Sequence, residues 1–343
     1  MQGLFLHVFR NAARFALGSL AVTLILIGSD SRARGAEPTM GEIMNAVVEI
    51  HAEIRPDARS VASLGESRGG SGVLIGDQGL ILTIGYIVME AKRIRVRPRG
   101  GPTLDADLVA YDHDTGFGLL RARGTISAKP LELGNSDALE EGDRLLVVSV
   151  GEQMPVSPVQ VVSRRSFAGS WEYLLENAIY TMPAHREFGG AALIDQSGKL
   201  VGVGSLIIND APGPETEGYG NMFVPVEILK PVLSSLVATG RSNAPAGPWL
   251  GVYLREVQGQ LLVLRVADGG PAATAGLSPG EVILGVDGHR VSTLEDFFRR
   301  VRARGGAGTD VPLDVLTYKD SDMSVRKLAV TSRDRHGWLR MGN

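Results

Sequence analysis

Serine and histidine are the two residue types in this chain that could together break an acyl bond. Such chemistry needs a hydroxyl that attacks, a base with a pKa near 7, and a carboxylate that orients the base. The serines to consider are Ser71, Ser166, Ser170 and Ser205, and the histidines are His113 and His185. The chain has no cysteine, which excludes thiol catalysis and disulfides. Its six histidines form no His-Glu-x-x-His motif, so we expect no metal and no cofactor.

The composition describes a folded, strand-rich chain. Its 343 residues are 44% hydrophobic and 21% charged, so it can bury a core, and the length predicts about two domains. The 44 glycines, with no long run of helix formers, favour many short strands. The net charge of −3 gives no general positive excess, so we expect no nucleic-acid partner.

Short apolar runs between turn residues predict the strands of a first domain. They cover residues 71–74, 80–83, 93–97, 117–121, 145–150 and 200–208. Before these strands, apolar residues recur at helical spacing and predict a helix within 40–55. After them, the sequence predicts a second helix within 226–238, with Gly240 as its stop. Residues 242–248, which read SNAPAGP, are predicted to be a linker.

The remainder forms a second, smaller unit. Strands are predicted at 261–266, 282–286 and 311–316, with a tight turn at Asp287-Gly288. A capping box from Ser292 to Glu295 predicts a helix start, and Leu294, Phe297, Phe298 and Val301 follow on one face.

The N-terminus has the pattern of an export signal. Arg10 and Arg14 precede an apolar stretch over residues 15–28, which has the length of the apolar core of a signal peptide and is too short for a membrane span. Ala33 and Gly35 suit a cleavage site. We therefore expect cleavage and a periplasmic or other extracytoplasmic location; membrane association follows only if the segment stays uncleaved as an anchor.

Several motifs, in order along the chain, resemble the HtrA/DegP family of serine proteases. Those in the first domain are Gly70-Ser71-Gly72-Val73-Leu74-Ile75 with Leu80-Ile81-Leu82-Thr83, Phe188-Gly189-Gly190 with Leu193-Ile194-Asp195, and Met222-Phe223-Val224-Pro225-Val226. The resemblance implies a mainly β fold, in which a trypsin-like double six-stranded β-barrel is followed by a PDZ-like α/β domain. The implied boundaries are 1–35 for the signal, 36–241 for the protease fold, 242–248 for the linker and 249–343 for the PDZ domain.

The catalytic positions depart from that family. Tyr86 stands where the family has its histidine, Gly116 where it has its aspartate, and Phe188 where it has its serine. A phenol with a free pKa near 10 is no base at neutral pH, and neither glycine nor phenylalanine supplies a reactive atom. The former oxyanion loop, Arg186, Glu187, Gly189 and Gly190, retains its two glycines. We therefore expect no catalytic residue and no useful hydrolysis.

The resemblance also implies a peptide site in the second domain. Trp249-Leu250-Gly251-Val252 resembles the carboxylate-binding loop of PDZ domains, where a glycine lets backbone N–H groups approach the ligand. Leu294 and Phe298 would line the helical wall of the groove, or belong to the core as Phe297 is expected to do. The expected partners are exported polypeptides or protein C-termini, and the family implies a trimer.

Three functions remain open at this point. The first is a pseudoprotease that binds polypeptides as a scaffold, adaptor or chaperone-like factor. The second is an active serine endopeptidase in envelope protein quality control, either of the family type or with a triad relocated to His113 or His185. The third is a structural subunit of an envelope complex. Separately, Arg93, Arg95 and Arg97 alternate with Ile94 and Val96, which favours the outer face of a strand over a lipid-binding patch.

Overall fold

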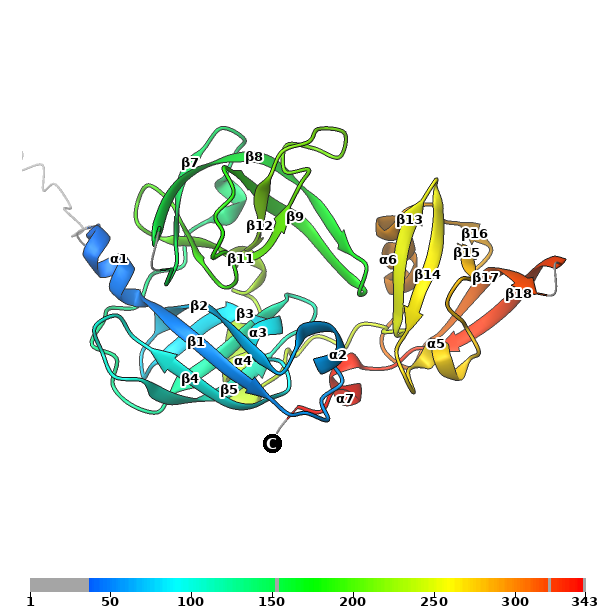
Figure 1. The fold of residues 1–343 in the computed structure, drawn as a ribbon, viewed down its shortest axis with the longest axis horizontal. Coiled ribbons are helices and arrows are strands. Elements are labelled where there is room, and N and C mark those ends of the chain that lie inside the picture. Colours follow the sequence, from blue (N-terminus) through cyan, green and yellow to red (C-terminus); the bar gives the residue numbers. More distant parts are fainter. Residues whose placement is uncertain (1–36, 152–153, 320–321, 342–343) are drawn as a thin grey trace, which may run out of the picture. The chain divides into compact units, whose positions relative to one another are not determined.

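The computed structural model describes residues 37–151, 154–319 and 322–341, and its strands form two closed barrels and one further sheet (Figure 1). The strand order is β1-β2-β3-β6-β5-β4 in the first barrel and β10-β11-β12-β9-β8-β7 in the second. The third sheet has the order β13-β14-β15-β17-β18, with β16 paired to β15. The predicted fold class, a double six-stranded barrel followed by a smaller α/β unit, is confirmed. The predicted signal segment lies outside the described residues.

The first barrel contains every strand predicted before residue 122 and two that were missed. Its elements are α1 (Met40–Ala46), β1 (Val47–Ile54), α2 (Val61–Leu64), β2 (Ser67–Gly76), β3 (Leu80–Ile84), α3 (Gly85–Val88), β4 (Ala91–Arg97), β5 (Leu104–Tyr111) and β6 (Phe117–Ala122). All five residues of β3 are buried, and every second residue of β1 from Val48 to Ile54 is buried, so their side chains fill the barrel.

The second barrel includes a long hairpin that the sequence did not predict. Its elements are η1 (Ser136–Ala138), β7 (Arg144–Val148), β8 (Val156–Gly169), β9 (Tyr173–Met182), β10 (Ala192–Ile194), β11 (Leu200–Ile208), β12 (Gly220–Pro225), η2 (Val226–Ile228) and α4 (Leu233–Thr239). Strand β11 has the predicted bounds. The β8–β9 hairpin turns at Ser170-Trp171-Glu172, where Glu172 has a positive φ of 60°.

The third sheet packs against one helix. Its elements are β13 (Val252–Val257), β14 (Gln260–Val266), α5 (Pro271–Thr274), β15 (Val282–Val286), β16 (His289–Arg290), α6 (Leu294–Ala303), β17 (Asp310–Lys319), β18 (Asp322–Thr331) and α7 (Arg335–Trp338). Asp287 and Gly288 form the predicted tight turn, with φ of 52° and 74°, but it leads into the short β16. The strands and α6 share a hydrophobic cluster separate from the barrel cores, and Leu174 of β9 also belongs to it.

Two predicted helices differ from the structure. The helix predicted within 40–55 ends at Ala46, because the alternating apolar side chains from Val48 to Ile54 suit a strand with one buried face. The helix predicted within 226–238 is divided: η2 ends at Ile228 and α4 begins at Leu233, after Pro231. Its predicted stop is correct, since Gly240 caps α4 in the left-handed conformation.

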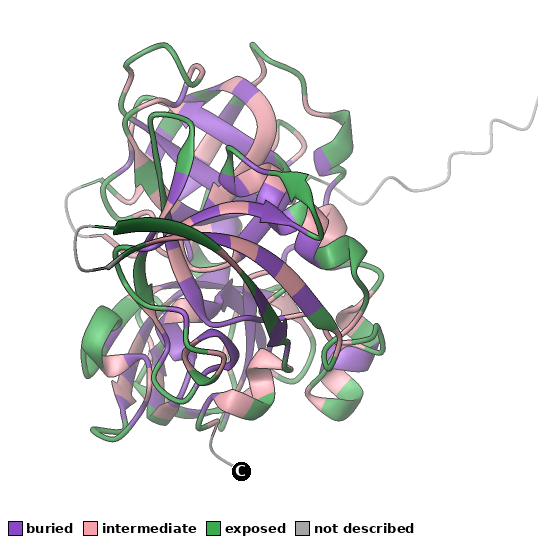
Figure 2. Cartoon of the chain, turned by 90° about the vertical axis from the view of Figure 1, so that its right-hand side faces the viewer, coloured by how far each residue is buried: buried purple, intermediate pink, exposed green. Residues whose placement is uncertain are grey.

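Burial is concentrated on the inward faces of the strands (Figure 2). The last described residues return to the first barrel, where Leu339 packs with Met89 and Tyr111, and the Arg340 amide donates to Glu90 over 2.7 Å. Within the described ranges, no helix has the length and apolar character needed to cross a bilayer.

Candidate functional site

Tyr86, which the family resemblance assigns to the histidine position, lies on α3 directly after β3. Its hydroxyl donates to the carbonyl oxygen of Ser205 over 3.0 Å. The same hydroxyl lies 3.1 Å from where a Cβ on Gly189 would be, so Tyr86 contacts the residue after Phe188. Burial raises the pKa of Tyr86 above its usual value, and the phenol therefore stays protonated and cannot accept a proton.

Gly116, which the family resemblance assigns to the aspartate position, lies next to α3. Its carbonyl accepts from the Gly85 amide over 2.8 Å, and its φ is +79°. A Cβ at this position would lie 2.8 Å from the hydroxyl oxygen of Tyr173, which donates to the Thr115 carbonyl over 3.0 Å. The space that a side chain would need here is therefore filled by Tyr173.

Phe188, which the family resemblance assigns to the nucleophile position, precedes a tight backbone turn. The side chain is half-buried and is part of no hydrophobic cluster formed by the described residues. Gly189 accepts from the Ser71 amide over 2.8 Å, and a Cβ on Gly190 would lie 1.9 Å from the Ser71 carbonyl oxygen. Arg186 and Glu187 are exposed. The loop therefore keeps its close backbone packing, while its side chains include no hydroxyl.

His185 is the histidine that contacts serine side chains. It is buried, and its Nδ1 and Nε2 lie 2.9 Å from the hydroxyls of Ser157 and Ser149 respectively. A Glu187 oxygen lies 3.8 Å from Nε2, the nitrogen that already faces Ser149. Desolvation lowers the pKa of His185, with a smaller opposing effect of Glu187. Both serines are buried as well, so no reactive hydroxyl at this cluster is open to a large substrate.

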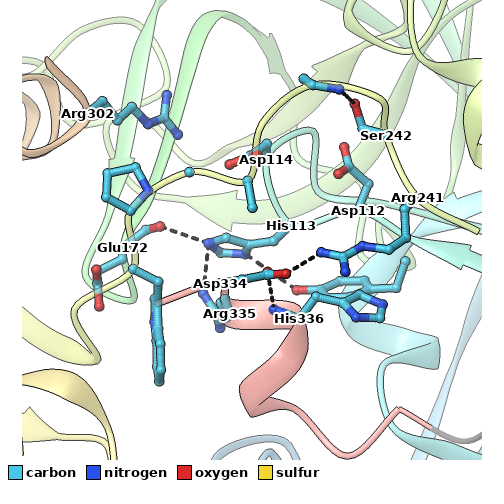
Figure 3. Close-up of a pocket in the computed structure, with 16 residues that line it drawn as sticks. Asp112, His113, Asp114, Glu172, Arg241, Ser242, Arg302, Asp334, Arg335 and His336 are labelled. Atoms are coloured by element: carbon cyan, nitrogen blue, oxygen red, sulfur yellow. Dashed lines mark hydrogen bonds and ion pairs between the residues drawn. The ribbon is translucent and has the colours of Figure 1, made fainter. Parts of the chain in front are cut away.

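His113 and the other serines do not form a catalytic pair in the described structure. The Nε2 atom of His113 lies 3.0 Å from the Glu172 carbonyl oxygen and 2.9 Å from Nη1 of Arg335 (Figure 3). Burial first, and Arg335 second, hold its pKa well below the usual value. Among the described residues, no hydrogen bond joins a histidine to the side chains of Ser71, Ser166, Ser170 or Ser205.

The predicted carboxylate-binding loop is in contact with a carboxylate. Oε2 of Glu172 accepts from the Leu250 amide over 2.8 Å, and Oε1 accepts from the amides of Gly251 and Val252 over 2.6 and 2.7 Å. Gly251 has a φ of +80°, which turns successive N–H groups toward one point. The Trp249 amide instead donates to the Arg333 carbonyl over 3.0 Å.

Leu294 and Phe298, on α6, are both buried in the hydrophobic cluster of the third sheet. Phe297, expected in the core, is fully buried there. The same cluster contains Leu174 from β9, which is 3% exposed. The helical wall therefore contacts a residue of the β8–β9 hairpin as well as its own sheet.

Comparison with known families supports this architecture. Residues 70–203 match the family model described as a trypsin-like peptidase domain, and residues 248–326 match that of a PDZ domain. The chain is 27% identical, over 76% of its length, to a probable periplasmic serine endoprotease, DegP-like, of Pseudomonas fulva. It is 26% identical, over 72% of its length, to the periplasmic pH-dependent serine endoprotease DegQ of Escherichia coli. The chain is an HtrA/DegP-like protein.

Solved structures agree with the fold of this HtrA/DegP-like chain. Two structures of the HtrA-type protease AlgW with tripeptide match with TM-scores of 0.53 and 0.51, both at 24% identity. They cover 88% and 89% of this chain, and 95% and 99% of the matched chains. The matches to the two sequence relatives span only 55% and 56% of those proteins' lengths.

Three contacts of this HtrA/DegP-like chain were missed by sequence reasoning. Glu172 reaches a loop almost eighty positions later, Tyr173 fills the space at Gly116, and Ser149 and Ser157 flank His185. None has a local motif. The one available signal was the pair of aromatic residues around Glu172 in an otherwise polar turn. Among the described residues, no cluster of three or more His, Cys, Asp or Glu side chains could hold a metal ion.

Proposed function

We propose that this HtrA/DegP-like chain is an exported pseudoprotease that binds polypeptides or C-terminal peptides as a scaffold, adaptor or chaperone-like factor. The absence of catalysis is inferred from one observation: the protonated hydroxyl of Tyr86 lies beside the turn at Phe188 and Gly189. A protonated phenol and a benzene ring stand at the positions aligned with base and nucleophile, and Gly116 offers no carboxylate. Acyl transfer by the family route has no attacking atom here.

The peptide-binding part of the proposal is supported by the loop at residues 250–252. Three adjacent backbone amides bind one carboxylate, which is the chemistry needed to hold the end of a peptide. The solved AlgW structures are named with tripeptide and with decapeptide, so peptide binding is a property of a protein with this fold. The ligands of this chain would be hydrophobic peptides with a free terminal carboxylate.

The proposed location is the periplasm. Relatives of this chain are named periplasmic endoproteases, and its own N-terminal residues have the basic-then-apolar pattern of an export signal. The proposed partners are therefore exported polypeptides.

An active serine endopeptidase is the second candidate, and the His185 cluster favours it. Ser149 and His185 lie at hydrogen-bond distance, and the relatives are named as endoproteases. Against it, the nitrogen that an orienting carboxylate should contact faces Ser157 instead, and both hydroxyls are buried.

Incubation of the purified chain with a fluorophosphonate probe and with unfolded casein separates these candidates. We expect neither labelling nor cleavage, with an active HtrA-type protease as the positive control. Labelling that disappears in Ser149→Ala or Ser157→Ala would establish a relocated active site and overturn the pseudoprotease proposal. Binding to many unfolded clients supports the adaptor or chaperone-like role, whereas purification with one fixed partner would indicate a structural subunit.

A further inference from the structure

The groove between β13 and α6 is occupied by the turn of the β8–β9 hairpin, residues 170–174. Three kinds of contact hold it there: a carboxylate in the backbone loop, a main-chain hydrogen bond to β13, and an apolar side chain in the cluster under α6. An extended peptide bound to a PDZ domain makes these same three kinds of contact.

The carboxylate contact comes from Glu172. Its two oxygens accept from all three amides of the loop, at 2.6 to 2.8 Å. The terminal carboxylate of a peptide would need these same donors. Glu172 and such a peptide therefore cannot bind the loop together.

The main-chain contact is made by Ser170. Its carbonyl accepts from the Leu254 amide over 3.0 Å. Leu254 lies on β13, two residues beyond the carboxylate loop. Strand β13 is at the edge of its sheet and pairs with β14 on one side, so the Leu254 amide on its other side can donate to a further strand. An added peptide strand would use this donor, so the hairpin blocks the strand edge as well as the loop.

The apolar contact is made by Leu174. Its side chain is buried with Leu250 and Phe298, while its neighbour Leu175 is buried in the barrel core. Successive residues of a strand point to opposite faces, so Leu174 is directed at the groove. Its carbonyl also accepts from Nη2 of Arg302 on α6 over 3.1 Å.

Tyr173 lies between the two groove-binding residues and connects the groove to the former catalytic site. Glu172 binds the loop, Leu174 fills the apolar pocket, and the hydroxyl between them occupies the space at Gly116. Displacing residues 172 and 174 from the groove removes the contacts of both chain neighbours of Tyr173, so that its hydrogen bond to Thr115 and its packing in the barrel core remain to hold it. Binding at the groove and packing at Gly116 are thereby coupled through three consecutive residues.

We propose that residues 170–174 are an internal ligand that closes the groove, and that a hydrophobic peptide with a free carboxylate binds by displacing Glu172 and Leu174. The proposal rests on the peptide-binding function proposed above. It assigns Glu172 as the residue that sets the affinity for peptide, because a peptide must compete with it.

The test compares the full chain with Glu172→Gln. Glutamine keeps one acceptor oxygen, but its amide nitrogen is a donor and replaces the second, so at least one loop amide loses its acceptor. Glu176→Gln is the matched control: it removes a carboxylate from the same hairpin, but Glu176 is exposed and, among the described residues, pairs with Arg299 alone, at 3.0 Å. Leu174→Ala is a second variant that vacates the apolar pocket and leaves the carboxylate in place.

Two measurements are needed, titration calorimetry with a hydrophobic peptide and hydrogen exchange at the amides of residues 250–254. We expect Glu172→Gln to bind the peptide about tenfold or more tightly than the wild type, because a loop amide loses its acceptor in the closed groove; tenfold corresponds to about 1.4 kcal/mol. We expect Leu174→Ala to bind more tightly than the wild type too, and Glu176→Gln to behave as the wild type. Exchange at Gly251, Val252 and Leu254 should accelerate in Glu172→Gln, and the C-terminally amidated peptide should show no such gain.

Equal peptide affinities and equal exchange in all four proteins would overturn the internal-ligand proposal and leave the peptide-binding function standing. The opposite failure is also distinguishable. If Glu172→Gln accelerates exchange but no protein binds the peptide, the peptide-binding function and the competition are both overturned, and only the hairpin contact remains.

Discussion

The hydroxyl oxygen of Tyr173 lies 2.8 Å from the position that a Cβ on Gly116 would occupy. Tyr173 is buried, and desolvation raises its pKa, so it is a protonated donor to the Thr115 carbonyl. A side chain at residue 116 must displace this hydroxyl and must also adopt a φ of +79°. Both the backbone conformation and the packing therefore oppose an aspartate at residue 116.

We predict that Gly116→Ala lowers the free energy of unfolding by about 2–4 kcal/mol, the sum of left-handed strain and overpacking. Urea denaturation followed by circular dichroism measures this loss. Gly288→Ala is the control, because Gly288 has a similar φ of +74° and no atom within 4 Å of the added Cβ. It should lose only about 1–2 kcal/mol. Equal losses for the two variants would show that Tyr173 does not fill the site.

The predictable part of the fold follows from side-chain alternation. Strand β11 was predicted to the residue because apolar residues dominate it, and its first six residues are buried. The helix predicted within 40–55 was wrong beyond Ala46, since Ile43, Val47 and Ile50 fit a helical period by chance, while Val48, Ile50, Ala52 and Ile54 alternate as the inner face of β1. Strand β8 was missed because its polar residues and Pro158 obscure the alternation. In the structure, every second residue from Ser157 to Ser163 is buried.

The site divides in a similar way. The residue types at 86, 116 and 188 are visible in the sequence, and the absence of suitable atoms follows from side-chain chemistry alone. Their assignment to catalytic roles rests on the resemblance and remains a proposal. The contact between Glu172 and residues 250–252 depends on how the hairpin meets the third sheet. No spacing rule connects positions so far apart, so it was found only in three dimensions.

Peptide binding should depend on pH through Glu172. Burial raises the pKa of its carboxyl to about 7, although the three loop amides lower it. Because the pKa is raised only in the closed groove, the closed state favours the protonated carboxyl. The free energy that favours closure is therefore complete below pH 4.5 and decreases as the pH rises through 7. We therefore expect peptide affinity to increase by about tenfold between pH 5.5 and pH 8, as closure weakens.

Calorimetry at the two pH values tests this, with Glu172→Gln as the control that should show no such increase. The control is needed because other charged groups line the same cavity: Asp112, His113, Asp114, Arg241, Arg302, Asp334, Arg335 and His336 (Figure 3). An equal increase in Glu172→Gln would assign the pH dependence to one of these groups.

The arginines of β4 should not bind an anionic membrane. Arg93, Arg95 and Arg97 lie 3.1, 3.0 and 2.5 Å from carboxylates of Asp105, Glu53 and Glu49 on the neighbouring strands. Each positive charge is thus paired along the strand face, which agrees with a solvated outer face. We expect the wild type not to sediment with vesicles that contain phosphatidylserine.

A variant with Glu49→Gln, Glu53→Gln and Asp105→Asn provides the matched comparison. It leaves three unpaired arginines on the same face, and each basic group near an anionic surface contributes about 1 kcal/mol, so we expect it to sediment. Stability should change little, by about 0.2–1 kcal/mol per exposed pair. Sedimentation of the wild type itself would show instead that the stripe binds lipid.

His185 should make the protein sensitive to acid. Its pKa is lowered by burial, so the unfolded chain binds a proton more readily than the folded one, and the stability that results is complete above pH 6.5 and is lost as the pH falls. His185→Gln should reduce the free energy of unfolding at pH 7.5 by about 1–3 kcal/mol, because Ser149 or Ser157 loses a buried partner. It should also lose less further stability than the wild type between pH 7.5 and pH 5, which urea denaturation at both pH values measures.

The control is His289→Gln, a change at an exposed residue, which should match the wild type in stability at both pH values. A wild-type protein that is equally stable at the two pH values would show that His185 is protonated without cost, and therefore that the cluster with Ser149 is open to solvent.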